Sequence, residues 1–95
     1  MFIVMLKFSE NKGRAGEHMA SHNEWLESGF VDGVFLMAGS LEPGLGGGIL
    51  AHNTDREALQ DRVSRDPFVA QDIVAAEIVE MTPKRVHERL QFMLE

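Results

Sequence analysis

The sequence predicts a single α+β domain with the order β-α-β-β-α-β, followed by a short C-terminal helix. Four apolar segments have the length of strands, two segments between them have a helical period, and glycine or proline marks the boundaries. The strand-like segments are residues 1–8, 33–40, 49–52 and 73–81. A chain of 95 residues falls in the lower part of the single-domain range, so one domain is expected.

The first strand and the first helix differ in the period of their apolar side chains. Residues 1–8 are apolar on both alternating faces, which is typical of a strand that is covered on both sides. From about Glu17 to Val31, apolar and aromatic residues recur with the period of a helix that buries one face. Gly29 and Gly33 lie near the end of this segment, where helices favour glycine.

A hairpin is predicted next. Residues 33–40 are apolar and end in small residues, and residues 49–52 lead into the strand that pairs with them. The connection at 42–48 is rich in glycine and predicts a flexible turn. It lacks the Lys-Ser/Thr of a phosphate-binding loop and leads into a strand, which argues against a nucleotide site.

The second helix, the fourth strand and a tail complete the domain. Residues 54–57 have the pattern of a capping box, which predicts a helix over 55–64. Pro67 ends this helix, because proline disfavours the helical conformation in the residue before it. Residues 73–81 predict the last strand, and residues 84–95 have the spacing of a short helix.

This order of elements predicts an uncovered sheet face. Right-handed crossovers place both helices on one face of an antiparallel sheet, as in ferredoxin-like folds. The first strand is nevertheless apolar on the other face as well. An exposed apolar face of several strands would exceed the few hundred Å² that a monomer normally shows. We therefore expect a homodimer in which two sheets pack face to face.

Composition excludes several kinds of partner. The net charge is −6 and no Lys/Arg cluster is present, so we expect no nucleic acid. No apolar run approaches the roughly 20 residues of a membrane helix, and no basic segment precedes the apolar start, so we expect no membrane and a cytoplasmic location. The absence of cysteine excludes disulfides and thiolate metal sites.

Two histidines are candidates for chemistry. His18 and His22 are four positions apart on the first predicted helix and therefore share a face, as in helical zinc sites. Met19 stands where a zinc protease has its glutamate, so two surface histidines are the favoured interpretation and no metal is expected. No cofactor motif is present either, and we expect no cofactor.

Asp66 is a second candidate, because Pro67 holds it in an extended conformation beside Phe68. The alternative is a turn-forming aspartate that bonds its own backbone. Trp25 is expected to be a core or interface anchor. Core packing is also expected of the methionines at predicted apolar positions, Met1, Met5, Met19, Met37, Met81 and Met93.

Several segments together resemble the YciI-like, or YCII-related, family in order and spacing. They are His22-Asn-Glu-Trp-Leu, Gly33, Ala38-Gly39-Ser40, Gly47-Gly-Ile-Leu, Asp66-Pro67-Phe68 and Glu77-Ile-Val-Glu-Met-Thr-Pro. The resemblance implies a YCII-related domain over residues 1–86 and a helical tail over residues 87–95. It also implies the dimeric α+β barrel superfamily as the fold.

In that family the helix histidine and the aspartate of the Asp-Pro-aromatic motif are the suspected active pair. The resemblance therefore implies His22 and Asp66 as the catalytic pair, with Ser40 as a third polar group. The substrate-binding residues expected on the same basis are His18, Trp25, Gly39 and Phe68. This sequence departs from the family at Met19, where an arginine is frequent, and the departure weakens the case for an anionic substrate.

Proton transfer is the activity that these residues favour. A carboxylate can orient an imidazole that moves a proton, which contributes typically about 10²–10⁴-fold to a rate. The chlorohydroxyquinol dehydrochlorinases resemble this domain and imply a cofactor-independent lyase or isomerase acting on a small cyclic or phenolic substrate. Two alternatives stay open: a non-catalytic small-molecule binding or accessory module, and a relative of the monooxygenases and muconolactone isomerases.

Overall fold

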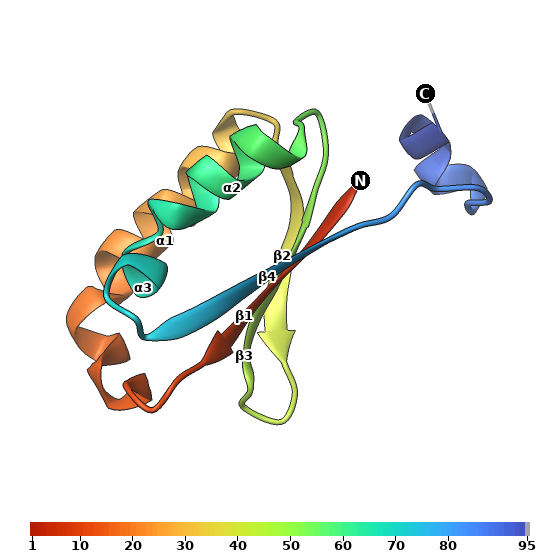
Figure 1. The fold of residues 1–95 in the computed structure, drawn as a ribbon. Helices are drawn as coiled ribbons and strands as arrows, with labels where there is room; N and C mark the ends of the chain where they lie inside the picture. The colour runs from red at the N-terminus through yellow and green to blue at the C-terminus, as the bar shows by residue number, and fades with distance from the viewer. Residues whose placement is uncertain (95) are drawn as a thin grey trace.

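The computed structural model describes residues 1–94 and confirms the predicted α+β architecture. Its helices and strands are β1 (Phe2–Phe8), the 3-10 helix η1 (Lys12–Arg14), α1 (Ala15–Val31), β2 (Phe35–Leu41), β3 (Gly46–Ala51), α2 (Arg56–Ser64), α3 (Pro67–Ala70), β4 (Val74–Glu80) and the 3-10 helix η2 (Glu88–Leu94). Figure 1 shows α1, α2 and α3 on one side of the sheet. The predicted placement of both long helices on one face is thus confirmed.

The sheet has the strand order β2-β3-β1-β4, and every neighbouring pair is antiparallel. β1 is therefore central, which explains why it is apolar on both faces. Phe2, Val4 and Leu6 alternate along β1 and are buried toward the helices. This helix-covered face carries the core.

The core lies between the sheet and the helices. Its buried side chains are Phe2, Val4, Leu6, Phe35, Ile49, Ala51, Leu59, Val63, Phe68, Ile73 and Val74. Gly29 allows α1 to approach β2 closely, because a Cβ atom there would overlap the ring of Phe35. The glycine near the end of the predicted helix therefore has a packing reason.

The opposite sheet face carries an apolar row that crosses all four strands. Met37, Leu50, Ile3 and Val79 lie in register on β2, β3, β1 and β4. They alternate with the buried residues, so their side chains point away from α1 and α2. Met37 is 58% exposed and Val79 is 39% exposed. We call these four residues the open-face row.

Core packing was the wrong expectation for three of the methionines. Met19, Met37 and Met81 are between 44% and 58% exposed in the single chain. Met37 belongs to the open-face row, and Met81 follows β4 at the start of the tail. An apolar period identifies the face on which a side chain lies, but it does not show whether the same chain covers that face.

The glycine-rich segment is not a flexible turn throughout, as the sequence had suggested. β3 begins at Gly46, and Gly46, Gly47 and Gly48 pair with Lys7, Leu6 and Met5 of β1. The turn itself is shorter. The backbone N–H of Leu45 closes it by donating a hydrogen bond to the backbone oxygen of Leu41 at 2.8 Å. Glycine has a low intrinsic strand propensity, but pairing with the central strand overrides that preference.

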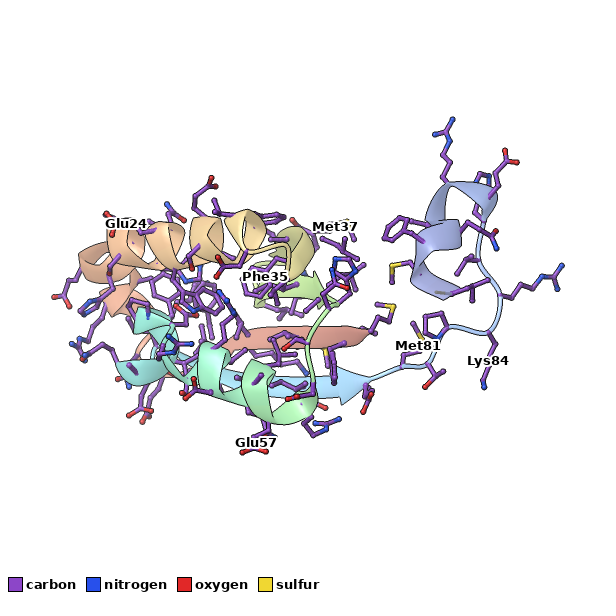
Figure 2. The ribbon with its side chains drawn as sticks, turned by 90° about the horizontal axis from the view of Figure 1, so that it is seen from above. Glu24, Phe35, Met37, Glu57, Met81 and Lys84 are labelled. Atoms are coloured by element: carbon purple, nitrogen blue, oxygen red, sulfur yellow. The ribbon has the colours of Figure 1, made fainter. Side chains whose placement is uncertain are left out.

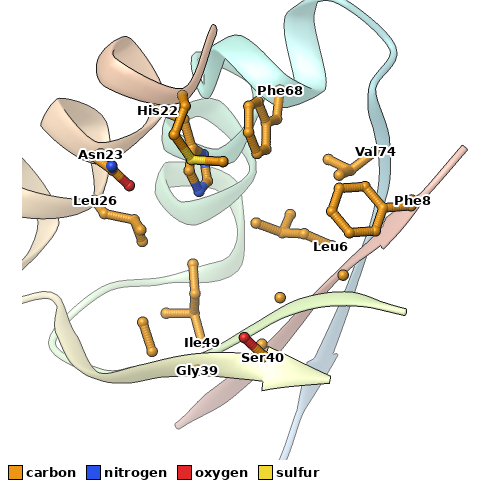
Figure 3. Close-up of a pocket in the computed structure, with 15 residues that line it drawn as sticks. Leu6, Phe8, His22, Asn23, Leu26, Gly39, Ser40, Ile49, Phe68 and Val74 are labelled. Carbon is orange, nitrogen blue, oxygen red and sulfur yellow. The ribbon is translucent and has the colours of Figure 1, made fainter. Parts of the chain in front are cut away.

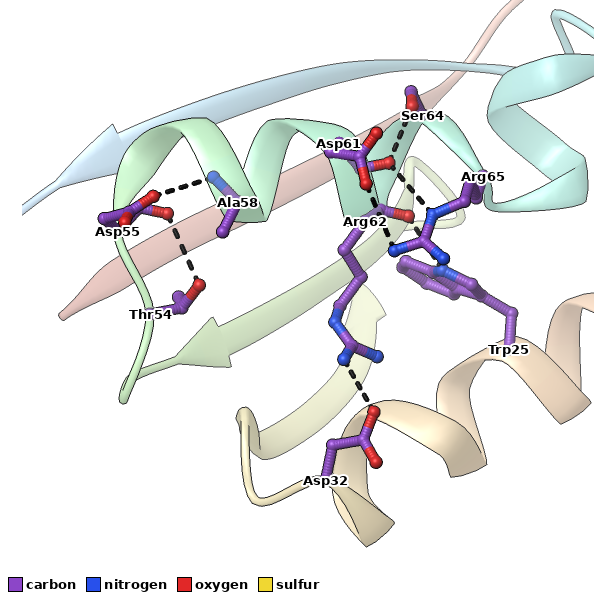
Figure 4. A network of polar contacts seen from close by, with 9 residues as sticks. All are labelled: Trp25, Asp32, Thr54, Asp55, Ala58, Asp61, Arg62, Ser64 and Arg65. Atoms are coloured by element: carbon purple, nitrogen blue, oxygen red, sulfur yellow. Dashed lines mark hydrogen bonds and ion pairs between the residues drawn. The ribbon is translucent and has the colours of Figure 1, made fainter.

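The start of α2 also differs from the prediction. Asp55 is its N-cap, and its Oδ1 accepts a hydrogen bond from the backbone N–H of Ala58 at 2.8 Å. The capping box predicted at Thr54 and Glu57 is therefore wrong, because the helix begins one residue later. Figure 4 shows this cap together with the polar contacts farther along α2.

Pro67 ends α2 as predicted, but it also begins the short helix α3, which was not anticipated. Proline suits the first position of a helix, where its missing N–H would have no partner in any case. Asp66 becomes the N-cap of α3. Four residues are too few for a helical period to be visible in the sequence.

The tail forms the 3-10 helix η2, interrupted at Leu90, where an α-helical spacing had been expected. Its ribbon lies apart from α1 and α2 in Figures 1 and 2, but its side chains approach the sheet. The ring of Phe92 lies 6.1 Å from that of His52, and tail residues line a cavity together with Ile3, Met37 and Leu50. The division into residues 1–86 and 87–95 stays a prediction, and Glu95 lies outside the described residues. Within residues 1–94 no helix combines the length and the apolar character that crossing a membrane requires.

Candidate active site

The structure brings His22 and Asp66 into direct contact although they are 44 positions apart. Nδ1 of His22 lies 2.8 Å from Oδ1 of Asp66. The side chain of Asp66 is fully buried, and that of His22 is 12% exposed. An ionised carboxylate only accepts hydrogen bonds, so beside it Nδ1 is the donor of this contact, and Nε2 is the ring nitrogen left to exchange a proton with a ligand.

The start of α3 positions the carboxylate of Asp66. The same Oδ1 accepts a hydrogen bond from the backbone N–H of Phe68 at 3.0 Å. Asp66 therefore caps a helix and holds the imidazole with one oxygen, so the two interpretations that the sequence left open describe one arrangement. Its other oxygen, Oδ2, is buried and has no hydrogen-bond partner among the described residues.

Two aromatic side chains pack against the imidazole of His22. The ring of Phe68 is parallel to it within 4°, with the centroids 4.0 Å apart. The ring of Trp25 lies farther away, at 5.9 Å between centroids. Together with the bond from Nδ1, these contacts fix the orientation of the ring.

Trp25 is itself held in place by α2. Its Nε1 donates a hydrogen bond to the backbone oxygen of Arg62 at 2.9 Å. The guanidinium of Arg62 pairs with Asp32, which follows α1, at 2.7 Å. Figure 4 shows these contacts joining the two long helices. They keep α1, which carries His22, in a constant position relative to α2.

A cavity of about 300 Å³ lies between α1, α3 and the sheet. It is lined by Leu6, Phe8, Met19, His22, Asn23, Leu26, Ala38, Gly39, Ser40, Gly46, Gly47, Gly48, Ile49, Phe68 and Val74. Figure 3 shows His22 entering it from α1, with Ser40 on the strand side. The polar side chains among these residues are those of His22, Asn23 and Ser40, and no Lys, Arg, Asp or Glu side chain lines it.

The predicted site residues divide into three groups. His22, Gly39, Ser40 and Phe68 line the cavity. Asp66 lies behind His22 and contacts it directly. His18 and Trp25, which were expected to bind substrate, are not among the lining residues. Trp25 instead packs between His22 and Phe35.

Asn23 and the strand glycines line the cavity but were not selected from the sequence. Asn23 directly follows His22, and its position in the same motif was the available signal. The glycines were assigned to a turn, which concealed their place on the cavity wall. Across residues 1–94, no cluster of three or more His, Asp and Glu side chains is arranged to hold a metal ion.

The chain was compared with protein families, with curated sequences and with solved structures. No curated protein sequence matches the chain. Among solved structures, it is similar to 5-chloro-2-hydroxyhydroquinone dehydrochlorinase from Burkholderia phenoliruptrix AC1100 in complex with 2,5-dihydroxybenzoquinone, with a TM-score of 0.68 and 15% sequence identity over 85% of this chain and 93% of the other. Identity at this level shows a common α+β fold and no more. The model of the YCII-related domain matches residues 1–82, and the chain therefore belongs to the YCII-related domain family.

Proposed function

We propose that this protein is a cofactor-independent lyase or isomerase that moves a proton on a small cyclic or phenolic substrate. The observation that carries the proposal is the contact of His22 with a fully buried carboxylate at the wall of a largely apolar cavity. His22 is the general base and acid, Asp66 orients it, and Ser40 is a hydrogen-bond donor to the substrate.

The expected chemistry follows from the hydrogen bonding of the imidazole. Nε2 of His22 accepts a proton from the substrate, and the carboxylate of Asp66 stabilises the imidazolium that forms. In an elimination, Nε2 takes a hydroxyl proton from the ring and delivers it to the halogen-bearing carbon, which becomes tetrahedral as a C=O bond forms. Loss of a second hydroxyl proton to Nε2, and from there to solvent, then drives an electron pair through the ring, and the halide departs with the electrons of its bond to leave a quinone. In an isomerisation, the imidazolium returns the proton to a different atom. The Ser40 hydroxyl stabilises the oxygen on which negative charge develops.

The size and polarity of the cavity support a substrate with one ring. Its volume of about 300 Å³ lies at the lower end of the range for ligand sites. The lining residues include no Lys or Arg, which favours a neutral ligand. The dehydrochlorinase with the similar fold is named for a chlorinated hydroquinone and holds a dihydroxybenzoquinone, and this likeness supports the same class of substrate here.

The proposed assembly is a homodimer in which a second copy covers the open-face row. Met37, Leu50, Ile3 and Val79 form an apolar band across the full width of the sheet. Met81 extends the exposed apolar surface beyond the end of β4. Covering such a band is favourable, because each Å² of apolar surface removed from water contributes a free energy of roughly 25 cal/mol. The similarity to a dimeric α+β barrel supports this arrangement.

The test compares His22→Gln with His18→Gln. Both replace an imidazole by an amide on α1, but His18 does not line the cavity. The substrates are chlorohydroquinone and 5-chloro-2-hydroxyhydroquinone, and chloride release is measured with product analysis by chromatography. We expect turnover by the wild type, a loss of about 10²–10⁴-fold in His22→Gln, and no loss in His18→Gln.

Unchanged turnover in His22→Gln would refute the proposed role of the imidazole. A compound that binds in the cavity and is recovered unaltered after long incubation would instead indicate a binding module. Isothermal titration calorimetry with the same compounds distinguishes these two results.

A further inference from the structure

Three consecutive glycines in β3 call for an explanation, because glycine weakens the interior of a strand. One of them is required by the fold, and a second is tightly packed. Gly46 has a φ of +137°, and a Cβ atom there would overlap the backbone oxygen of Leu6. A Cβ atom at Gly48 would lie 3.2 Å from Cδ2 of Leu41, which is a tight contact.

Gly47 has no such requirement. It is not among the glycines with positive φ. A Cβ atom built on it would come near only the backbone oxygen of Gly39, at 3.5 Å, which is an ordinary contact. A strand glycine without a steric or conformational reason often marks a place where a ligand approaches the backbone closely.

The missing side chain of Gly47 would have pointed into the cavity. Gly47 pairs with Leu6 of β1 and with Ser40 of β2, and all three line the cavity. It precedes Ile49 by two residues, and the buried side chain of Ile49 faces the helices. Because side chains alternate along a strand, a side chain at position 47 would project toward the same face, between Leu6 and Ser40.

We propose that Gly47 sets the size limit of the ligand by leaving bare backbone opposite the helix wall that carries His22. A neutral, single planar ring, such as a phenol or a quinone, lies against the backbone of β3, and its oxygen substituents reach Ser40 and Asn23. This inference rests on the proposed function in that it takes the same cavity as the site. Beyond the proposed function, the inference names Gly47 as the residue that selects the ligand and a neutral single-ring compound as the class of ligand.

The test uses Gly47→Ala and Gly47→Val, with Gly16→Ala in α1 as the matched control. A Cβ atom at Gly16 meets nothing within 4 Å, and Gly16 does not line the cavity. Hydroquinone is titrated into each protein without oxygen, up to about 10 mM, and binding is followed by chemical-shift changes in ¹H–¹⁵N NMR spectra. The Tm of each protein is measured in parallel.

We expect the wild type and Gly16→Ala to bind hydroquinone alike, Gly47→Ala to bind at least about ten-fold more weakly, and Gly47→Val to show no binding. The Tm of Gly47→Ala should rise by about 2–8 °C, because alanine in a compatible conformation restricts the unfolded chain. A weaker affinity in a more stable protein distinguishes a ligand-determining residue from a structural one.

Equal affinities in the wild type and both Gly47 variants would overturn the inference, and so would a lower Tm in Gly47→Ala. Failure of the wild type to bind hydroquinone would overturn the assigned class of ligand. The readout does not depend on turnover. Loss of binding in the Gly47 variants, together with unchanged turnover in His22→Gln, would therefore support this inference while refuting the proposed proton transfer.

Discussion

Asp66 combines two tasks that the sequence had offered as alternatives. One of its oxygens accepts hydrogen bonds from the backbone of Phe68 and contacts Nδ1 of His22. The other oxygen is buried and has no partner among residues 1–94. A buried carboxylate oxygen without a hydrogen bond costs free energy. Stability alone would not favour a carboxylate here, whereas orientation of an imidazole does.

Asparagine and alanine at position 66 separate these two tasks. Asp66→Asn keeps an acceptor oxygen for Phe68 and His22 but removes the charge, so most of the stability should remain. Asp66→Ala leaves a buried N–H and the imidazole without a partner, and should lower the free energy of unfolding by about 1–3 kcal/mol. Both variants should lose turnover by about 10²-fold or more, since neither stabilises the imidazolium.

Urea denaturation gives the stabilities, and chloride release from chlorohydroquinone gives the turnover. Full activity in Asp66→Asn would mean that the charge of Asp66 is not needed for the reaction. Equal stability of Asp66→Ala and the wild type would mean that its hydrogen bonds contribute nothing to the fold.

At the scale of elements, long periodic segments were predictable and short or irregular ones were not. The helix expected from about Glu17 to Val31 is α1, which starts two residues earlier. Seventeen residues repeat the helical period several times, so the signal is strong. The four residues of α3 contain about one turn and carry no such signal.

The N-cap of α2 provides a test at this scale. Asp55→Ala removes the acceptor for the backbone N–H of Ala58 and should lower the free energy of unfolding by about 1 kcal/mol. Thr54→Ala should have a much smaller effect, because the hydroxyl of Thr54 bonds only the backbone oxygen of Asp55, at 3.4 Å. Both changes can be measured by urea denaturation. A larger loss of unfolding free energy in Thr54→Ala than in Asp55→Ala would instead support Thr54 as the N-cap, as the sequence had predicted.

For the whole molecule, the central question is what covers the open-face row. The helices α1, α2 and α3 cover only the other face of the sheet (Figure 1). The tail lines a cavity together with Ile3, Met37 and Leu50 of the row, but it leaves Met37 58% exposed. Met37 lies on β2, an edge strand of the sheet, at one end of this row, and is more than half exposed. The proposed sheet-to-sheet dimer would bury it near the partner's sheet.

Met37→Glu should therefore convert the proposed dimer into a monomer, because a charge buried without a partner costs several kcal/mol. Val31→Glu is the control. Val31 is 74% exposed at the end of α1, on the other side of the sheet, so the dimer should persist in that variant. Light scattering coupled to size exclusion, at micromolar concentration, measures both masses. A monomeric wild type under these conditions would contradict the proposed assembly.

The sequence by itself determined the order of the four strands and the two long helices, and the face of the sheet on which these helices lie. These features are encoded locally, in the apolar period and in the conformational limits of proline. The resemblance to YciI-like proteins also named His22 and Asp66 as a pair.

Only the tertiary structure decided that these two side chains are in contact at 2.8 Å, and that Gly47 lies on a cavity wall. It also excluded Trp25 and His18 from the lining of that cavity. The physical reason is that such contacts join residues far apart in the chain. They depend on strand register and on the packing of α1 and α3 over the sheet, which no local pattern specifies.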